Sequence, residues 1–478
     1  MQSGLEEQLG PYQKRIPIVT RSIKGRFRSF KNAVLVFAYS VFFLLPWLPW
    51  ARADAPSQAV LLDIPGRRFL VFGLTAYPQD IVWLALLLFI AAILLFFVTG
   101  LVGRAFCGYF CFQTLWTDFF IWIERTLQGE RPARIRLYRQ PWNAEKILKL
   151  GGTHVLWLVV SFGTALTFVL YFAYAPDLLS RFFRGEAALA AYVTVALLTV
   201  TTYAAAGLMR EQICTYVCPY GRFQSVMYEP QTLTVHYDSR RGEGAHGRAV
   251  ARPGLRTLAE RHAQAHGDCV DCGLCVQVCP AGIDIRDGLQ YKCISCGLCV
   301  DACNSIMDSL KFPRGLIRYD AEANLVQPAP AKPKLYWKRF SIVGYGLALC
   351  LMTGYLAYSI ATRSHSNYAI TQIRQPLYVV LSNGDIRNRY QIRLTNTSGH
   401  DIAYRIAGIG LPEGALDLGH FEQVSIKTGH SALVQASVRL SPARAAQTSA
   451  FQFEITPLGM EKERYLTTVR FDKPETSA

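Results

Sequence analysis

Five long runs without a charged residue constrain the fold of this 478-residue chain more than any other feature. Each run is long enough to cross a hydrocarbon layer of ~30 Å as a helix. Aromatic residues such as Trp47, Trp50 and Tyr355 stand near the ends, where membrane–water interfaces favour such rings. The first run is too long for a cleaved signal peptide and lacks a small-residue cleavage site. We expect five spans, over Asn32–Ala51, Ile81–Val102, Thr153–Ala175, Ala187–Met209 and Phe340–Thr362.

Lysine and arginine are unevenly distributed between these runs. Residues 1–31 carry 7, residues 103–152 carry 8 and residues 210–339 carry 17, whereas the two short loops carry 3 and 2. By the positive-inside rule the three basic segments are cytoplasmic, so the N-terminus is inside and the C-terminal part outside. The net charge of +16 then reflects topology rather than nucleic-acid binding.

Eight of the 13 cysteines form two runs of the pattern C-x2-C-x2-C-x3-C. Bacterial two-cluster ferredoxins hold [4Fe–4S] clusters in this way, and the fourth Cys of each run ligates the other cluster. Structural zinc also uses paired C-x2-C, but it explains a third closely spaced Cys poorly. We expect two [4Fe–4S] clusters and a function in electron transfer. The predicted ligands are Cys269, Cys272, Cys275 and Cys303 (site I) and Cys293, Cys296, Cys299 and Cys279 (site II).

Two C-x3-C pairs, hereafter the membrane cysteines, follow the second and fourth apolar runs. They are Cys107 with Cys111, and Cys214 with Cys218. In a helix this spacing puts both sulfurs on one face, and pseudo-symmetry of the two hairpins would bring the four thiols together. Soft sulfur ligands select Cu(I), zinc or iron–sulfur clusters. Beside two clusters a reducible metal is favoured over zinc, which has no redox chemistry, so we expect these cysteines to bind and reduce copper.

Five further residues near these cysteines have two interpretations each. Arg104 and Arg210 precede the two pairs and either lower the thiol pKa values or merely flank the spans. His154 is expected at the membrane interface rather than on a metal. Asp118 and Glu124 are expected to be solvated surface acids rather than groups that handle protons or copper.

The remaining segments have distinct patterns. An amphipathic stretch at Leu115–Leu127 is expected along the membrane surface. Residues after Asn367 alternate in short runs separated by turn signals, which indicates an immunoglobulin-like β-sandwich. Cys350 is expected to be packed and inert, and His400, His420 and His430 to lie on the surface. The expected strands are Tyr378–Leu381, Tyr390–Leu394, Val424–Ile426, Ala432–Leu440, Phe451–Thr456 and Tyr465–Phe471.

These segments give an expected domain order. It is a basic tail (1–31), a transmembrane hairpin (32–102), a cytoplasmic C-x3-C segment (103–152), a second hairpin (153–209), a C-x3-C-P segment with a linker (210–266), a two-[4Fe–4S] ferredoxin domain (267–312), a linker (313–339), a fifth span (340–362) and a periplasmic immunoglobulin-like domain (363–478). The part of the first linker over 236–266 is expected to be solvated, with some helix near Arg256–His266.

The chain resembles the FixG/CcoG (RdxA) family of ferredoxin-type membrane proteins, accessory to cbb3-type cytochrome c oxidase. The resemblance rests on stretches such as Cys107-Gly108-Tyr109, Gln113–Asp118, Trp122–Arg125, Arg240–Glu243, Gly282–Tyr291, Gly315–Tyr319 and Ile386–Tyr390. It implies a protein of the bacterial inner membrane that reduces Cu(II) to Cu(I) for assembly of that oxidase. Phe112 departs from the family, which has proline after both C-x3-C pairs, but both ligands of the pair remain.

Two other functions remain open. The first is a quinol-linked electron-transfer subunit resembling the NapH and NosR proteins, which share paired C-x3-C-P sites. The second is a scaffold whose clusters only stabilise a partner-binding fold. The sequence also leaves open the cytoplasmic electron donor, the cluster potentials and the oligomeric state, a homodimer included.

Overall fold

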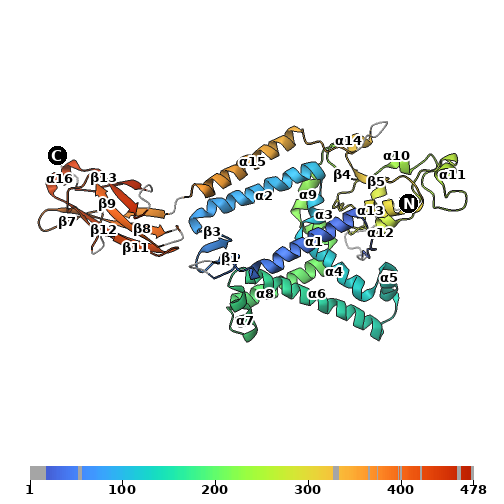
Figure 1. The fold of residues 1–478 in the computed structure, drawn as a ribbon, viewed down its shortest axis with the longest axis horizontal. Coiled ribbons are helices and arrows are strands. Elements are labelled where there is room, and N and C mark those ends of the chain that lie inside the picture. Colours follow the sequence, from blue (N-terminus) through green and yellow to red (C-terminus); the bar gives the residue numbers. More distant parts are fainter. Residues whose placement is uncertain are drawn as a thin grey trace. The chain divides into compact units, whose positions relative to one another are not determined.

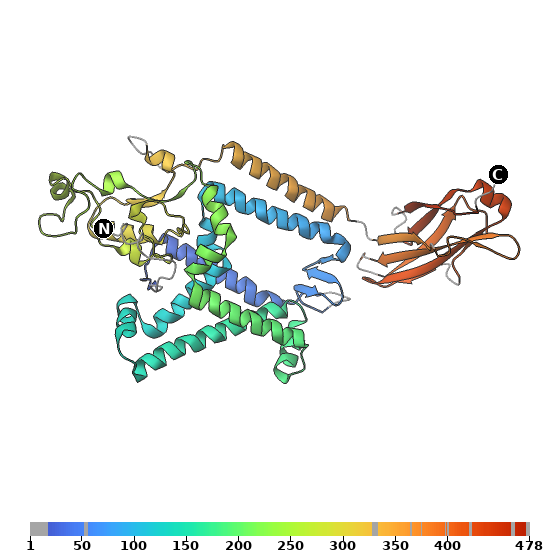
Figure 2. The same ribbon diagram turned by 180° about the vertical axis from the view of Figure 1, so that it is seen from behind.

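The computed structural model describes residues 18–51, 56–326, 333–363, 366–373, 375–396, 398, 401–419, 423–459 and 464–474, without the side chains of Gln79 and Ser225. The chain divides into two compact units, Met1–Leu356 and Ala357–Ala478, which are described separately. Figures 1 and 2 show their elements from opposite sides.

Five helices in the described residues are long and apolar enough to cross a membrane, by length and composition. They are α1 (Arg26–Leu44), α2 (Ile81–Val102), α6 (Ala144–Leu170), α8 (Leu189–Thr202) and α15 (Phe340–Ala361). The 3-10 helix η1 (Leu45–Trp47) continues α1, and the π-helix η3 (Tyr203–Met209) continues α8. Their positions agree with the five apolar runs, although several ends are shifted.

The largest shift at a helix start is in α6, which begins at Ala144 instead of Thr153. The side chain of Asn143 caps this helix, because its oxygen accepts the N–H of Lys146 at 2.8 Å. The capped turn holds Lys146, whose ammonium donates to the carbonyls of Tyr138 and Gln140. The charged residue Lys146, which precedes the apolar run, is therefore still part of the helix.

The amphipathic segment forms α4 (Phe112–Gln128), but its apolar face is covered by protein. Phe120 is fully buried and stacks on Trp157 of α6 with ring centroids 5.4 Å apart. The apolar face of this helix therefore packs on other helices of the chain, whereas the sequence analysis expected it on the membrane surface. The core around it consists of Val34, Leu115, Trp116, Phe120, Ile123, Trp157 and Ala206.

Short elements that the sequence analysis did not anticipate fill the connections. After α2 come α3 (Ala105–Tyr109) and, beyond α4, α5 (Arg131–Arg139). The loop between α1 and α2 carries a three-stranded antiparallel sheet, β1 (Val60–Asp63), β2 (Arg68–Val71) and β3 (Leu74–Ala76), followed by η2 (Pro78–Asp80). Helix α7 (Ala175–Arg184) connects α6 and α8.

The cluster-binding region is tied together by β4 (Thr234–Tyr237) and β5 (Ile317–Asp320), which pair antiparallel with Val235 opposite Tyr319. The expected solvated linker before the clusters is in fact partly packed. Fully buried Arg261, in the expected helix, donates hydrogen bonds to the carbonyls of Gly267, Leu255, Ala249 and Cys269. The other elements here are η4 (Ile213–Val217), α9 (Pro219–Val226), α10 (Ser239–Gly242), α11 (Leu258–Ala263), α12 (Leu274–Gln277), η5 (Ile285–Asp287), α13 (Leu298–Ser309) and α14 (Glu322–Leu325).

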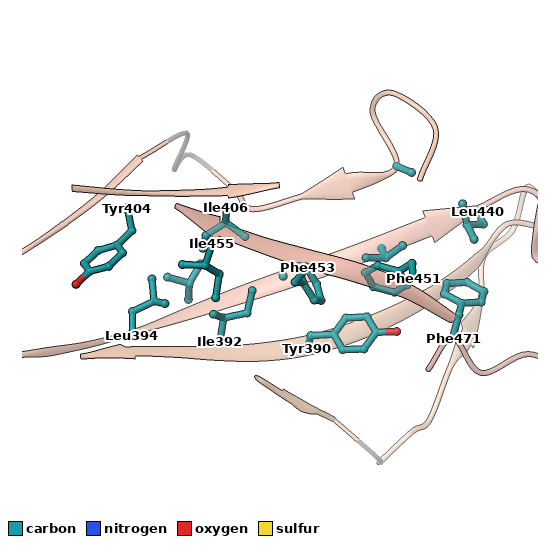
Figure 3. Packing of buried hydrophobic residues seen from close by; sticks show 14 of the residues in the cluster. Tyr390, Ile392, Leu394, Tyr404, Ile406, Leu440, Phe451, Phe453, Ile455 and Phe471 are labelled. Carbon is teal, nitrogen blue, oxygen red and sulfur yellow. The ribbon is translucent and has the colours of Figure 1, made fainter. Parts of the chain in front are cut away.

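The second unit is a β-sandwich, as expected. One sheet has the order β10-β12-β8-β6, with β7 also on β8, and the other has the order β11-β9-β13-β14. Figure 3 shows Tyr390 and Ile392 from one sheet and Phe453 and Ile455 from the other filling the space between them. The strands are β6 (Ser366–Gln372), β7 (Val379–Val380), β8 (Ile386–Asn396), β9 (Ile402–Ile409), β10 (Leu416–Asp417), β11 (Gln423–Ile426), β12 (Ser431–Leu440), β13 (Ala450–Pro457) and β14 (Tyr465–Arg470), and α16 (Pro442–Gln447) follows β12.

Candidate iron–sulfur and thiol sites

The two ferredoxin-type runs fold alike around paired left-handed residues. Asp271 and Gly273 have φ of 44° and 64°, and Ser295 and Gly297 have φ of 49° and 70°. Gly273 and Gly297 are the N-caps of α12 and α13. The left-handed turns let each loop curl back so that its cysteines face one space, and glycine accepts this conformation without strain.

The cysteines of the two runs line two pockets in a crossed arrangement. One pocket is lined by Cys269, Cys272, Cys275 and, from the far end of the second run, Cys303. The other is lined by Cys293, Cys296 and Cys299 with Cys279 of the first run, and Cys275 also reaches it. Each pocket thus has the four thiols that a cubane needs, with mostly apolar side chains as its remaining walls. This donor set suits [4Fe–4S] clusters at sites I and II.

Burial shapes the acidity of these thiols. It raises the pKa of Cys275 to about 11 and that of Cys279 and Cys303 to about 12. A thiol that binds a metal is deprotonated outright. Cluster binding must therefore displace protons that the folded chain otherwise holds tightly.

The membrane cysteines occupy equivalent places in two helix-break-helix segments. Cys107 lies in α3 and Cys214 in η4. Cys111 and Cys218 lie beyond these helices, in extended conformation, as the N-caps of α4 and α9. The expectation that each pair shares one face of a continuous turn is therefore wrong, since the helix ends between the two sulfurs in both pairs.

The two pairs nevertheless lie close enough for their charges to interact. The pKa of Cys107 is raised to about 12, chiefly by burial and to a lesser extent by nearby Cys111, Cys214 and Cys218. Burial likewise raises the pKa of Cys214 to about 11, with Cys111 and Cys218 as neighbours. The thiol of Cys107 donates to Oε1 of Gln224, which is fully buried, at 3.2 Å. The fold thus brings the four thiols into one neighbourhood.

Arg104 and Arg210 have different surroundings. Arg104 is buried, its Nε and Nη2 atoms have no hydrogen-bond partner, and its charge lowers the pKa values of Cys107, Cys214 and site II Cys293. Arg210 instead pairs with Glu124 and lies over the Trp157 ring. Only the first arginine is therefore directed toward the thiols.

Asp118 and Glu124 are buried, so the expectation that they are solvated surface acids is wrong. Asp118 pairs with Arg28 at 2.9 Å and with Lys31 at 3.5 Å. Burial by itself would raise the pKa of Asp118, but Lys31 and Arg28 hold it below its usual value. Glu124 pairs with Arg134 and Arg210. Both acids serve as buried counter-charges for basic residues of other segments.

The histidine and lone-cysteine expectations have mixed outcomes. His154 lies within α6, where its Nδ1 is 2.9 Å from the hydroxyl of Tyr203, so it packs between helices. Its place at the membrane interface stays a prediction. Cys350 is exposed on α15, so the expectation that it is packed is wrong. His430 is exposed and shares a hydrogen bond with the carbonyl of Thr428, whereas His400 and His420 lie outside the described residues.

In the described part of the chain no three His, Cys, Asp or Glu side chains converge on a position for a single metal ion.

Helix α3 connects the membrane cysteines to site II. The hydroxyl of Tyr109 donates to the carbonyl of Cys296 at 2.8 Å. At Gly108 an added Cβ would stand 2.6 Å from the carbonyl oxygen of Ile294 and 3.0 Å from Cα of Cys296. The backbone after Cys107 therefore lies directly against the loop that carries a site II ligand.

A small polar cavity of ≈ 50 Å³ opens beside Cys214 in the same region. Its charged walls are the cations Lys31, Arg104, Arg210 and Lys292 and the acids Asp118 and Glu211. It is therefore a charged space between the helices and the cluster-binding region.

Comparison with known proteins decides the family. The chain is 42% identical to protein RdxA of Cereibacter sphaeroides over 401 residues, which cover 83% of each protein. It is 41% identical to RdxB of the same organism (86% of this chain, 85% of RdxB) and 38% identical to nitrogen fixation protein FixG of Rhizobium meliloti (85% of this chain, 82% of FixG). The chain belongs to the FixG/RdxA family.

Three family models divide this FixG/RdxA-family chain as its fold does. A 4Fe-4S dicluster domain matches residues 209–322, a 4Fe-4S binding domain matches residues 84–129, and the IG-like fold at the C-terminal of FixG matches residues 356–474. The chain is therefore an iron–sulfur protein with an immunoglobulin-like C-terminal domain. Among solved structures, a FixG-related protein from Vibrio parahaemolyticus matches 23% of this chain and 98% of its own at 16% identity, with a TM-score of 0.21, which carries no argument.

Two functional contacts of this family member escaped the sequence analysis. Gln224 follows the second cysteine pair in sequence, and its bond to Cys107 depends on the packing of α9 against α3. Tyr109 was quoted only as part of a motif, although the small Gly108 before it was a signal for close backbone approach.

Proposed function

We propose that this chain is a membrane cupric reductase that supplies Cu(I) for assembly of cbb3-type cytochrome c oxidase. Electrons would come from sites I and II, and Cu(II) would be the substrate at the membrane cysteines. Family membership and the soft ligand set support this proposal. The link to the oxidase rests on the family resemblance alone.

One observation carries the proposal, namely the packing of α3 against the Cys296 loop. The Tyr109 hydroxyl and the close approach at Gly108 hold Cys107 next to a ligand of site II. The [4Fe–4S] clusters, when bound, supply electrons one at a time at potentials set by their surroundings. Reducing Cu(II) to Cu(I) consumes one electron, so a thiol site beside a cluster suits this reaction.

The chain's own residues would favour the reduced metal. Four thiolates bind Cu(I) better than a harder donor set would. Arg104, buried among Cys107, Cys214 and Cys293, stabilises the thiolate forms over the thiols. Gln224 orients Cys107 through the bond to its sulfur.

The topology proposed with this function has the N-terminus and both cluster sites in the cytoplasm. Five spans would then leave the immunoglobulin-like domain in the periplasm of a bacterial inner-membrane protein. The distribution of lysine and arginine supports this orientation. The oxidase assembly machinery is the proposed protein partner.

The double variant Cys214→Ser plus Cys218→Ser tests the site. It should keep its iron content and cluster spectrum, because these residues are absent from the walls of both cluster pockets. It should lose Cu(I) binding, and cells carrying it should have low cbb3-type oxidase activity at low copper. Cys350→Ser is the matched control, since this exposed cysteine belongs to neither site. Unchanged Cu(I) binding in the double variant would put the copper site elsewhere.

A further cluster at the membrane cysteines is the second candidate. The model of a 4Fe-4S binding domain over residues 84–129 favours it, because this range includes Cys107 and Cys111. Under this alternative the double variant would lose about a third of its iron, since three cubanes would then share the total. Iron analysis of the same protein therefore separates the two candidates.

A further inference from the structure

A large apolar groove has helix α3 as one of its walls. Its volume is ≈ 1330 Å³, and it is formed by the start of α1, by α2, by α3 and by α13 with β5. Pockets for organic ligands are usually large, apolar and furnished with a few polar groups. The apolar walls include Phe27, Phe30, Leu94, Leu95, Val98, Phe106 and Phe110.

One wall of this groove belongs to a helix suited to lipid. In the most apolar stretch of α2 none of the residues is buried inside the chain, and Leu94 is 47% exposed. A ligand could therefore enter from the hydrocarbon side without crossing water. The occupant should carry an apolar tail.

The opposite end of the groove is polar. The residues that contribute to it are Lys24, Arg26, Asp301, Asn304, Ser305, Asp308 and Arg314, and Arg314 pairs with Asp308. Such groups hydrogen-bond to carbonyl or hydroxyl oxygens. The occupant should therefore be amphiphilic, with oxygen atoms on its head.

Aromatic rings at this end touch the loop of site II. Tyr109 donates to the carbonyl of Cys296 and Tyr319 to that of Ser295. Phe30 packs edge-on against Tyr109 with ring centroids 5.0 Å apart, and Phe27 lies 5.3 Å from Tyr319. These rings offer flat and edge-on contacts to another aromatic ring. Such a ring would be separated from the loop of the predicted ligand Cys296 by one or two side chains.

We propose that this groove binds a lipid-soluble quinol, which is the electron donor of the chain. The inference rests on the proposed function, because it supplies the electrons for sites I and II, and it replaces the cytoplasmic donor expected from the sequence. A phospholipid would use the apolar walls and the cations. It would not explain why six aromatic side chains line the groove and three of them, Phe27, Tyr109 and Tyr319, support the cluster loop.

The redox balance is simple. Oxidation of one quinol to its quinone breaks two O–H bonds and releases two electrons and two protons. Clusters bound at sites I and II would each accept one electron, and both protons would pass to water at the polar end of the groove. Two Cu(II) ions are then reduced to Cu(I) for each quinol oxidised.

The test uses purified, cluster-replete protein in detergent without oxygen, with decylubiquinol as the probe. Decylubiquinol should bleach the visible absorbance of the clusters. Leu94→Trp, which fills the apolar wall, should slow this reduction about tenfold or more, equivalent to about 1.4 kcal/mol. Leu88→Trp is the matched control, because Leu88 is exposed on α2 but does not line the groove.

Binding is measured separately from reduction. Saturable binding of decylubiquinone, followed by calorimetry, should weaken in Leu94→Trp and in Phe30→Ala but not in Leu88→Trp. Clusters that decylubiquinol does not reduce, or equal rates and affinities in both tryptophan variants, would overturn the inference. Co-purified phospholipid that decylubiquinone cannot displace would overturn it too.

The same preparation distinguishes this inference from the proposed function. Protein reduced with dithionite bypasses the groove, so its reaction with Cu(II) reports the proposed function alone. If dithionite-reduced protein reduces copper but decylubiquinol does not reduce the clusters, the quinol site is disproved and the reductase function stands. The reverse result would support the quinol site and disprove the reductase function.

Discussion

At the scale of single residues, Arg104 has the most unusual surroundings. It is 3% exposed, and two of its guanidinium nitrogens lack a hydrogen-bond partner. Its charge lowers the pKa values of three cysteines that belong to two sites. An unpaired buried charge is costly, and a thiolate formed beside it would recover part of that cost. The sequence offered two equal explanations for this arginine and for Arg210, and only packing separates them.

Arg104→Gln should move copper reduction to higher pH. Burial already raises the pKa values of Cys107 and Cys214, and Arg104 counteracts this effect. Without the cation both thiols lose their protons only at higher pH, so the pH at which the rate is half-maximal should rise. Arg104→Lys should shift less because it keeps the charge. A pH profile of Cu(II) reduction that is the same in Arg104→Gln and wild type would contradict this role.

Asp118→Asn should destabilise the folded chain severely. The change leaves the nearly inaccessible Lys31 and the partly buried Arg28 without their counter-charge, and breaking a buried pair costs ~3–5 kcal/mol. Since the pKa of Asp118 is lowered on folding, its contribution is present above the ordinary carboxyl pKa and is lost as pH falls through the lowered value. Thermal unfolding in detergent measures the effect. Asp177→Asn, in an exposed pair with Arg181, should change little.

At the scale of elements, hydrophobic patterns predicted where helices and strands form better than they predicted what packs against them. The five apolar runs located five helices, and alternation located β7, β8, β11, β12, β13 and β14. Strand β9 was missed although Ile402, Tyr404 and Ile406 alternate and are buried. The pattern of α4 predicted a helix with an apolar face, but it could not tell a protein partner from a lipid surface. Buried acids such as Asp118 cannot be recognised without their partners from distant segments.

Gly108→Ala should disturb the contact between α3 and site II. A Cβ at this position would stand closer to the carbonyl oxygen of Ile294 than real contacts allow and tightly against the backbone of Cys296, so α3 must move away from the loop. We expect slower reoxidation of pre-reduced clusters by Cu(II), with iron content retained. Gly151→Ala on α6 is the matched control, because nothing lies within 4 Å of a Cβ there. Wild-type kinetics in Gly108→Ala would show that this contact is irrelevant to electron transfer.

At the scale of the whole molecule, the cysteine spacing alone predicted much of the candidate site. Crossed ligation was inferred from the repeat, and the pockets group Cys303 with the first run and Cys279 with the second. The meeting of the two C-x3-C pairs followed from their repeated placement after two hairpins. The packing of α3 on site II and the groove beyond it could not be inferred, because both depend on how α1, α2 and α13 approach one another.

The topology is tested by reporter fusions. An alkaline-phosphatase fusion near Ala478 should be active and one near Gly315 silent, since five spans would separate the cytoplasmic N-terminus from the last domain. A fluorescent-protein fusion that matures only in the cytoplasm should give the opposite pattern at the same two positions. Active phosphatase at Gly315 would put the cluster sites outside and invalidate the orientation.

The central claim is that electrons leave site II for copper at the membrane cysteines. The most direct measurement is the rate at which Cu(II) reoxidises clusters that were reduced with dithionite and freed of excess reagent, followed anaerobically by stopped-flow absorbance. We predict that wild type and Cys350→Ser reoxidise at the same rate while Cu(I) forms. The double variant Cys214→Ser plus Cys218→Ser should be slower by about tenfold or more, equivalent to about 1.4 kcal/mol on the barrier, with unchanged iron content. Reoxidation of the double variant at the wild-type rate would contradict the claim.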